Sequence, residues 1–183
     1  IMACGTGKTF TSLRIAEAMV PKGGRILFLA PSISLVAQTL REWTAEATTP
    51  FHAFAICSDS KVGREQEDLK THDLAYPATT NSTKLAEYAD IFASKDPDHR
   101  TVVFSTYQSI QVVSDAQKQG FGEFDLIICD EAHRTTGITR DGDEASDFVK
   151  VHDNAVVAGQ KRLYMTATPR IFADPSKQKA KEK

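Results

Sequence analysis

The sequence predicts an α/β domain in which a parallel sheet is covered by helices on both faces. Short apolar runs, which suit buried strands, alternate with longer stretches whose apolar residues recur every three or four positions, which suits helices. This alternation is typical of strand–helix–strand units. The chain has 183 residues, of which 41% are hydrophobic and 25% charged, and this is the size and composition of one such domain.

The first half of the chain contains two predicted helices and two predicted strands. A largely apolar helix follows the glycines near the start and ends at residues 21–24, where proline and glycine interrupt it. Residues 26–30 form a buried strand, and Ser32 opens a second helix that ends at residues 48–50. A further strand is expected at residues 52–57. The apolar positions of the second helix recur at helical spacing: Val36, Leu40, Trp43 and Ala47.

The connection over residues 58–100 is long for a crossover between strands. Its residues 61–70 are so rich in charge that they indicate a solvated face or a mobile loop. Within the connection, Asn81 or Ser82 can cap a helix that stops at residues 96–98. The expected apolar face of that helix consists of Leu85, Tyr88 or Ala89, and Phe92.

The rest of the chain is expected to add three strands and two helices. The strand that ends just before Asp130 is the most apolar of the set, and a polar loop over residues 135–143 follows it. No internal repeat is visible. The elements are expected, in chain order, at residues 101–105 (strand), 108–118 (helix, closed by Gly120), 125–129 (strand), 145–152 (helix) and 162–166 (strand).

Composition excludes several classes of protein. The longest apolar runs are far too short to cross a bilayer, and no charged-then-apolar leader opens the chain, so we expect no membrane. The three cysteines, Cys4, Cys57 and Cys129, form neither a disulfide framework nor a zinc knuckle, and a reducing cytoplasm fits them best. The net charge of −2 gives no global signal for nucleic acid, so such binding must use local phosphate contacts.

The segment Gly5-Thr6-Gly7-Lys8-Thr9 predicts a nucleotide site. Backbone N–H groups of such a loop, together with a helix N-terminus, hold the phosphates of ATP or GTP. Lys8 would reach the outer phosphates, and Thr9 would offer Mg²⁺ a hydroxyl. The strict pattern places glycine where this chain has Met2, so a glycine turn with an incidental Lys-Thr is the alternative.

Only four residues precede this loop, whereas a strand must deliver the chain into it. We therefore expect residues 1–183 to be one lobe of a longer protein, truncated inside its own fold at the N-terminus.

A second motif, Asp130-Glu131-Ala132-His133, directly follows a buried strand. In a parallel sheet it lies at the carboxyl edge, where the phosphate loop also lies. Asp130 is suited to hold a metal ion, and Glu131 to orient the attacking water and accept its proton. One alternative is an acidic helix N-terminus stabilised by its dipole. Another makes His133 a zinc ligand, but partners at metal-site spacing are missing.

The order of these motifs resembles the first motor lobe of the superfamily 2 helicases and translocases. The resemblance covers essentially the whole chain, and Met2 fits it because the family often replaces that first glycine. The matching segments are residues 5–9 (motif I), 30–32 (motif Ia), 104–108 (similar to the motif Ib region of restriction-type and remodeller-like motors), 130–133 (the DEAH form of motif II) and 166–168 (motif III).

More narrowly, four segments resemble the helicase-like ATPase of single-polypeptide restriction-modification enzymes, the type ISP group. Such enzymes translocate along duplex DNA rather than separating its strands, and they carry nuclease and methyltransferase parts elsewhere in the polypeptide. The segments are residues 2–5, 78–80, 130–136 and 161–170.

The resemblance implies a RecA-like P-loop NTPase lobe that uses ATP and Mg²⁺ and no other metal. Lys8, Asp130 and Glu131 would be catalytic, with Thr9 and Asp130 on Mg²⁺. The implied nucleotide contacts are Cys4, Gly5, Thr6, Gly7, Lys8, Thr9 and Phe10. The residues that would couple the ATP state to lobe movement are His133, Thr166, Ala167 and Thr168. The DNA-facing candidates are Pro31, Ser32, Thr106, Tyr107 and Gln108, for which helix capping is the alternative at Ser32.

The resemblance also implies that the isolated lobe is a poor enzyme. A second RecA-like lobe of the same polypeptide supplies the arginine that stabilises phosphoryl transfer, and an upstream segment holds adenine. The expected function is that of the ATP-hydrolysing motor lobe of a DNA translocase in a restriction-modification enzyme. The alternatives are a DNA or RNA unwinding helicase of another branch and a nucleotide-sensing lobe without turnover. The retention of Lys8, Asp130 and Glu131 weighs against the last.

Overall fold

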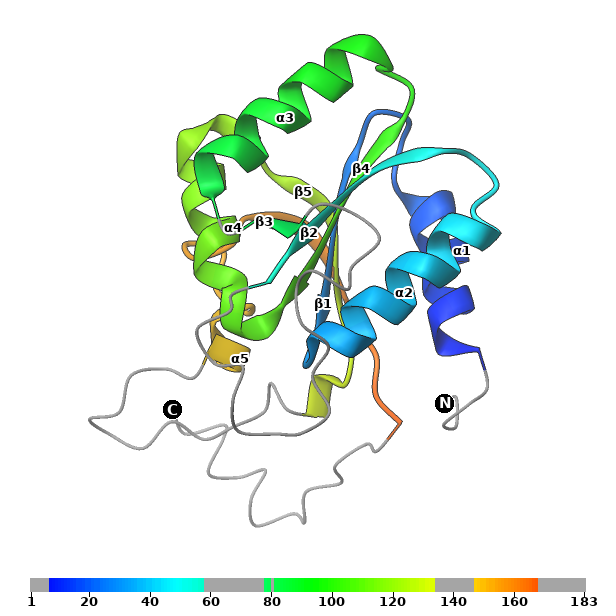
Figure 1. The fold of residues 1–183 in the computed structure, drawn as a ribbon. Coiled ribbons are helices and arrows are strands. Elements are labelled where there is room, and N and C mark those ends of the chain that lie inside the picture. The colour runs from blue at the N-terminus through cyan, green and yellow to red at the C-terminus, as the bar shows by residue number, and fades with distance from the viewer. Residues whose placement is uncertain (1–6, 58–77, 80, 134–146, 168–183) are drawn as a thin grey trace, which may run out of the picture.

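The computed structural model describes residues 7–57, 78–79, 81–133 and 147–167, and these form a six-stranded sheet between two layers of helices (Figure 1). The strand order is β3-β2-β4-β1-β5-β6, and every neighbouring pair is parallel. The predicted fold class is therefore confirmed. The strands are β1 (Arg25–Ala30), β2 (Phe51–Ile56), β3 (Ala78–Thr79), β4 (Arg100–Thr106), β5 (Phe124–Cys129) and β6 (Gly159–Tyr164).

Two of the helices begin at side-chain caps that the sequence indicates. Ser32 Oγ accepts a hydrogen bond from the main-chain N–H of Leu35 at 3.4 Å, and Asn81 Oδ1 accepts one from Lys84 at 3.0 Å. Of the two candidate caps for the third helix, the structure therefore selects Asn81. The α-helices are α1 (Lys8–Met19), α2 (Ile33–Glu46), α3 (Ser82–Lys95), α4 (Ile110–Ala116) and α5 (Asp147–Lys150). Among these described residues, no helix is long and apolar enough to span a membrane.

Each face of the sheet has its own apolar core. Side chains alternate along a strand, so Phe28 of β1 faces α1 and α2, whereas Leu27 and Leu29 face α3 and α4. On the first face the Trp43 ring of α2 meets the rings of Phe28 and Phe104 edge-on, each at 5.6 Å between centroids. Burial on both faces explains why the central strands are continuous apolar runs rather than alternating ones.

The end of the sheet differs from the prediction. Strand β6 begins at Gly159 rather than at residue 162, and it ends before Thr166. Its first residues, Gly-Gln-Lys, have weak strand propensity, but pairing with β5 overrides it. Glycine is required there by space, since a Cβ on Gly159 would lie 2.5 Å from Ile127 Cδ1. The two-residue strand β3 was also absent from the prediction.

The helix predicted at residues 108–118 is centred on α4, and the one predicted at 145–152 is α5, of whose predicted range residues 145–146 lie outside the described residues. Helix α4 is preceded by a 3-10 turn over Tyr107–Ser109 and followed by a π turn over Gln117–Phe121. In α3 the predicted face is buried at Leu85 and Ala89 but not at Tyr88 and Phe92, which are 45% and 40% exposed. The predicted polar loop over residues 135–143 lies outside the described residues.

Candidate active site

The carboxyl ends of the central strands bring the predicted motifs to one edge of the sheet. Ser32 follows β1, Thr106 ends β4, Asp130 follows β5, and Thr166 lies two residues after β6. Because all the strands are parallel, these four residues lie at the same edge. Helix α1 begins at this edge too, because its last turn lies against Arg100 at the amino end of β4 (Figure 1).

The start of α1 presents main-chain donors. Gly7 is the N-cap and has a φ of 81°, in the left-handed region that favours glycine. It provides no side-chain cap, so among the described residues no side chain caps the first N–H groups of α1, which suit an anion. Lys8 is the next residue and is partly exposed. The other predicted loop residues, Cys4, Gly5 and Thr6, lie outside the described residues. Phe10 is exposed, and its ring lies 4.6 Å below the Arg14 guanidinium.

Thr9 is fixed from two sides through its main-chain oxygen. Ser12 Oγ donates to this oxygen at 2.7 Å, and Trp43 Nε1 donates to it at 3.2 Å from helix α2. The Trp43 side chain is only 1% exposed, so this contact lies at the boundary between the core and the site. The sequence marked Trp43 only as a core residue, and no spacing rule connects it to Thr9.

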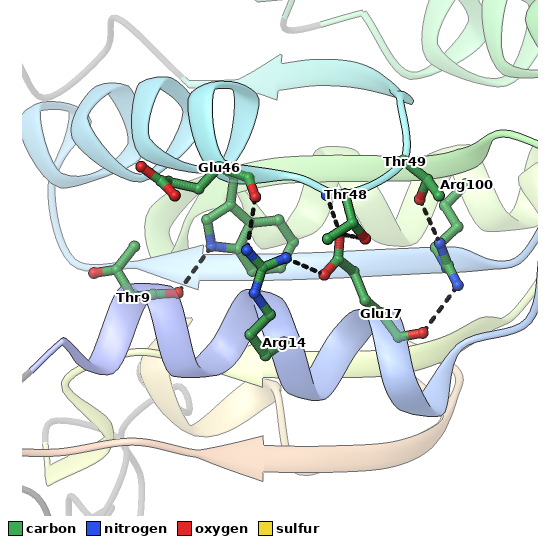
Figure 2. Close-up of polar contacts among 8 residues, drawn as sticks. Thr9, Arg14, Glu17, Glu46, Thr48, Thr49 and Arg100 are labelled. Atoms are coloured by element: carbon green, nitrogen blue, oxygen red, sulfur yellow. Dashed lines mark hydrogen bonds and ion pairs between the residues drawn. The ribbon is translucent and has the colours of Figure 1, made fainter.

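A polar network holds the rest of α1 in place (Figure 2). Arg14 donates to Glu17 Oε2 at 2.6 Å and to the Glu46 main-chain oxygen at 3.0 Å. Glu17 Oε1 accepts hydrogen bonds from the N–H and the hydroxyl of Thr48, both at 2.7 Å. Burial acts to raise the pKa of Glu17, but the hydrogen bonds from Thr48 and Arg14 outweigh it and lower this pKa. Helix α1 is thus tied to the end of α2.

Arg100, the first residue of β4, anchors the C-terminal end of α1. Its guanidinium donates to the main-chain oxygens of Glu17 and Val20, both at 2.9 Å, and to Thr49 Oγ1 at 2.9 Å; Figure 2 draws the contacts with Glu17 and Thr49. The first two acceptors are carbonyl groups near the helix end, which have no partner within the helix. The helix that carries Lys8 and Thr9 is therefore held at its start, its middle and its end.

The acidic turn after β5 is also anchored on both sides. Asp130 N–H donates to the Leu29 oxygen at 2.9 Å, and Ala132 N–H donates to the Met165 oxygen at 2.8 Å. Asp130 Oδ1 accepts a hydrogen bond from Glu131 N–H at 2.9 Å. Burial is the main reason that the pKa of Asp130 is raised, and the charge of Glu131 adds to it, while Lys8 and His133 act against it. A further cation near this carboxylate would stabilise its charged form.

The side chains at this edge fit Mg²⁺. A hard divalent cation takes oxygen ligands, and Thr9 and Asp130 offer a hydroxyl and a carboxylate. Burial and the charge of Glu131 raise the pKa of Asp130 more than the Glu131 N–H, Lys8 and His133 lower it, so a bound cation would favour the charged form of this carboxyl. These two residues would hold the ion, as the sequence predicts.

Glu131 has an unusual backbone. Its φ of 49° makes it the one non-glycine residue with a positive φ among the described residues. Such a conformation costs energy and is concentrated at functional sites, where the surrounding structure enforces it. Here the hydrogen bonds of Asp130 and Ala132 to β1 and to the end of β6 hold the turn.

His133 connects the acidic turn to the segment after β6. Its Nδ1 lies 3.1 Å from Glu131 Oε2 and 3.0 Å from Thr166 Oγ1. The structure thus brings together two of the predicted coupling residues, which are 33 positions apart in the chain. Ala167 is partly exposed beside them, and Thr168 lies outside the described residues. Their coupling role stays a prediction.

The DNA-facing candidates divide into two groups. Ser32 is partly exposed and caps α2, whereas Pro31 is buried. Thr106 is buried, and its hydroxyl lies 3.0 Å from Ser109 Oγ. Tyr107 is 0% exposed, and its hydroxyl donates to the Asp130 main-chain oxygen at 2.8 Å, so its side chain presents no surface to DNA.

A DNA contact at Tyr107 would therefore have to use its main chain, and this contact stays a prediction. A tyrosine at a strand end carries no sequence signal that separates a core position from a surface one. Gln108 is partly exposed, and its amide oxygen is buried without a hydrogen-bond partner among the described residues.

Two solved structures are similar to this chain over nearly its whole length. The structure is similar to the DNA-bound type ISP restriction-modification enzyme LlaBIII, with a TM-score of 0.80 and 49% identity over 93% of this chain and 11% of that one. It is also similar to a nuclease-deletion mutant of the type ISP enzyme LlaGI in complex with a DNA substrate mimic, with a TM-score of 0.73 and 45% identity over 94% of this chain and 15% of that one.

Two more distant similarities concern helicases. The Hef helicase domain of Pyrococcus furiosus has a TM-score of 0.55 and 20% identity over 94% of this chain and 30% of that one, a likeness of fold alone. A protein of African swine fever virus named as a probable helicase is 30% identical over 169 residues, which are 92% of this chain and 16% of the viral protein. The chain thus spans a small part of the relatives it matches.

The family comparison covers nearly the whole chain. The model of the ResIII family, described as the res subunit of type III restriction enzymes, matches residues 1–171. This range includes the start of α1, the acidic turn after β5 and the segment after β6. The chain belongs to the ResIII family and carries its helicase-like RecA-type lobe.

Proposed function

We propose that the chain is the ATP-binding and ATP-hydrolysing motor lobe of a DNA translocase within a single-polypeptide restriction-modification enzyme. One observation carries the proposal: the start of α1, Asp130 and the His133–Thr166 pair lie at the same edge of the sheet. Such a motor needs groups that bind the nucleotide phosphates and a carboxylate that binds the metal ion. It also needs a contact from this site to the segment after the last strand. The 45% and 49% identity to two type ISP enzymes supports the restriction context.

The residues would divide the chemistry as follows. The uncapped N–H groups of α1 and the Lys8 ammonium bind and orient the phosphates. Thr9 and Asp130 hold Mg²⁺, which offsets charge on the phosphate oxygens. Glu131 accepts the proton of the attacking water while the water oxygen bonds to the γ-phosphorus and the ADP oxygen leaves. His133, within 3.1 Å of Glu131, helps to place that carboxylate.

DNA, in duplex form, is the proposed partner, because the similar enzyme LlaBIII is bound to DNA in its solved structure. A second RecA-like lobe of the same polypeptide would complete the ATP site with an arginine. Residues 1–183 are then one lobe, with residues 58–100 as a long crossover. Ser32 and Gln108, which are partly exposed at the carboxyl edge, would be the side chains that meet a DNA phosphate.

The test is a Glu131→Gln substitution in the two-lobe polypeptide. Loss of the proton acceptor should lower DNA-stimulated phosphate release by about 10²- to 10⁴-fold while a fluorescent ATP analogue still binds. The matched control is Glu123→Gln, an exposed acidic residue just before β5. Unchanged turnover in Glu131→Gln would contradict the catalytic assignment and favour a nucleotide-sensing lobe.

A second experiment separates translocation from unwinding. The two-lobe polypeptide is assayed for displacement of a third strand from triplex DNA and, in parallel, for separation of a duplex. Displacement without separation supports the proposed translocase. Efficient strand separation would replace it with a helicase of another branch.

A further inference from the structure

Three potential metal ligands gather at the edge of the sheet opposite the active site. His52 is the second residue of β2, His99 directly precedes β4, and Asp96 directly follows α3. The strands β2 and β4 are neighbours in register, with Phe51 beside Arg100. Since these are the amino ends of parallel strands, the cluster is separated from Asp130 by the length of the sheet.

The three side chains converge. One candidate ligand atom from each of His52, Asp96 and His99 lies within 4.8 Å of the other two. The imidazole rings of the two histidines are 5.2 Å apart between centroids. The main chain also supports the arrangement, because the N–H of His99 donates to the Asp96 oxygen at 3.0 Å and closes the turn between them.

Two histidines and one carboxylate form a ligand set typical of zinc. Zn²⁺ binds imidazole nitrogen and carboxylate oxygen at about 2.0–2.2 Å, which places tetrahedral ligands roughly 3.3–3.6 Å from one another. The present separations are at most 4.8 Å, and Asp96 is exposed, so its side chain can rotate to close any difference. The hydrogen bond between His52 Nε2 and the Asp96 main-chain oxygen is long, at 3.4 Å, and a metal bond would readily replace it.

We propose that His52, Asp96 and His99 bind a divalent transition-metal ion of the zinc type. The site ties the starts of β2 and β4 to the end of α3, and water fills the remaining coordination position. The role is structural, since the cluster lies far from the nucleotide edge. This proposed site departs from the expectation that Mg²⁺ is the sole metal of the protein. The sequence does not indicate the site, because its three ligands are dispersed along the chain and match no spacing motif.

The neighbourhood of the cluster is compatible with a cation. Asp98, one residue from His99, is paired with Lys22 at 2.7 Å. The Lys95 ammonium lies 6.0 Å from the Phe92 ring centroid. The same ring packs against His52 at 5.3 Å and fixes one side of that imidazole. A simple aromatic cluster of Phe92 and the two histidines is the competing explanation, and it predicts no metal affinity.

The experiment titrates the chain with Zn²⁺ against a chromophoric chelator at pH 7.5, and with Co²⁺ followed by visible absorption. We expect one equivalent bound at this site. His52→Ala and His99→Ala should each weaken it by more than the 10- to 100-fold that loss of an outer partner costs. The control is His152→Ala, which removes an exposed histidine whose Nδ1 lies 2.9 Å from the Tyr164 hydroxyl. Equal Zn²⁺ binding by the three variants would overturn the proposal.

A measurement on the unchanged chain guards against variants that fail to fold. Two-dimensional NMR of the imidazole nitrogens should show that the signals of His52 and His99 shift on addition of one equivalent of Zn²⁺, while those of His152 do not. Zn²⁺ should also raise the unfolding temperature of the chain, because it binds the folded state. Unmoved His52 and His99 signals at saturating Zn²⁺ contradict the site, whatever else binds the metal.

Discussion

The hydroxyl of Tyr107 donates a hydrogen bond to the main-chain oxygen of Asp130 at 2.8 Å. The two residues follow β4 and β5, strands that are separated by β1 in the sheet. Burial is the main cause that raises the pKa of Tyr107 far above its ordinary value, so the hydroxyl keeps its proton and remains a donor. The position of the acidic turn therefore depends on the end of β4.

Removal of this hydroxyl by Tyr107→Phe should weaken the acidic turn. Loss of one buried hydrogen bond costs about 0.5–1.5 kcal/mol of unfolding free energy, measured by urea denaturation. In the two-lobe polypeptide, we also expect a lower kcat for ATP with little change in KM, because the displaced turn carries Glu131, which acts in the chemical step. Tyr88→Phe on the exposed side of α3 is the control. Identical kcat in Tyr107→Phe and wild type would show that the hydrogen bond is only structural.

Trp43 offers a second test, because it links the core to Thr9. Trp43→Phe removes the Nε1 donor and leaves a small cavity, and we expect a loss of about 1–3 kcal/mol in urea denaturation. Affinity for Mg-ATP in the two-lobe polypeptide should fall too, since Thr9 loses one of its two anchors.

The control for Trp43 is Phe51→Leu, which removes an aromatic partner at 6.4 Å without touching Thr9. This variant should lose stability but keep its affinity for Mg-ATP. If both variants lose affinity equally, general loosening of the core explains the effect and the link to Thr9 does not.

Much of the fold could be predicted because local chemistry specifies it. The central strands are continuous apolar runs, and Ser32 and Asn81 cap their helices with side chains that suit that position. The edge strand β6 was placed too late in the chain, because its first residues are polar and only pairing with β5 makes them a strand.

The site residues that belong to a short sequence motif could be predicted. Those whose position depends on tertiary contacts could not. Short patterns identify Lys8 and Asp130, and both lie at the carboxyl edge of the parallel sheet. The burial of Tyr107, the Trp43 contact to Thr9 and the convergence of His52 with His99 each join residues distant in sequence. No spacing rule reports such pairs, because they depend on which strands are neighbours.

The pairing of Glu17 with Thr48 and Arg14 should make stability depend on pH. The pKa of Glu17 is lowered from its ordinary value of 4.5, since these hydrogen bonds outweigh the effect of burial. The stabilisation is thus present above the unfolded-state pKa and is lost as the pH falls through the lower folded-state pKa. Glu17→Gln should be less stable than wild type at pH 7, and the difference should shrink in acid.

Glu87→Gln, an exposed position on α3, serves as the control for Glu17→Gln. Urea denaturation at several pH values below 7 measures both. A stability difference for Glu17→Gln that is constant with pH would show that the charge of Glu17 does not matter.

Asp130→Asn should stabilise the chain in the absence of nucleotide and Mg²⁺ while it abolishes ATP turnover. Burial, reinforced by the charge of Glu131, raises the pKa of Asp130 above its ordinary 3.8, so its ionisation opposes folding at neutral pH. This cost is full above the raised pKa and disappears below 3.8, where the carboxyl is protonated in both states. The asparagine Oδ1 can still accept the hydrogen bond from Glu131 N–H, so the turn should persist.

The stability gain of Asp130→Asn over wild type should therefore be present at pH 7 and vanish as the pH is lowered towards 3, in thermal or urea unfolding. Asp125→Asn provides the comparison, because Asp125 Oδ2 accepts a hydrogen bond from Arg25 N–H at the other end of β5. A loss of stability in Asp130→Asn at pH 7 would show that Lys8 and His133 already compensate the carboxylate. Mg²⁺ would then be unnecessary to relieve charge at this edge, and the argument that joins Asp130 to the metal would fail.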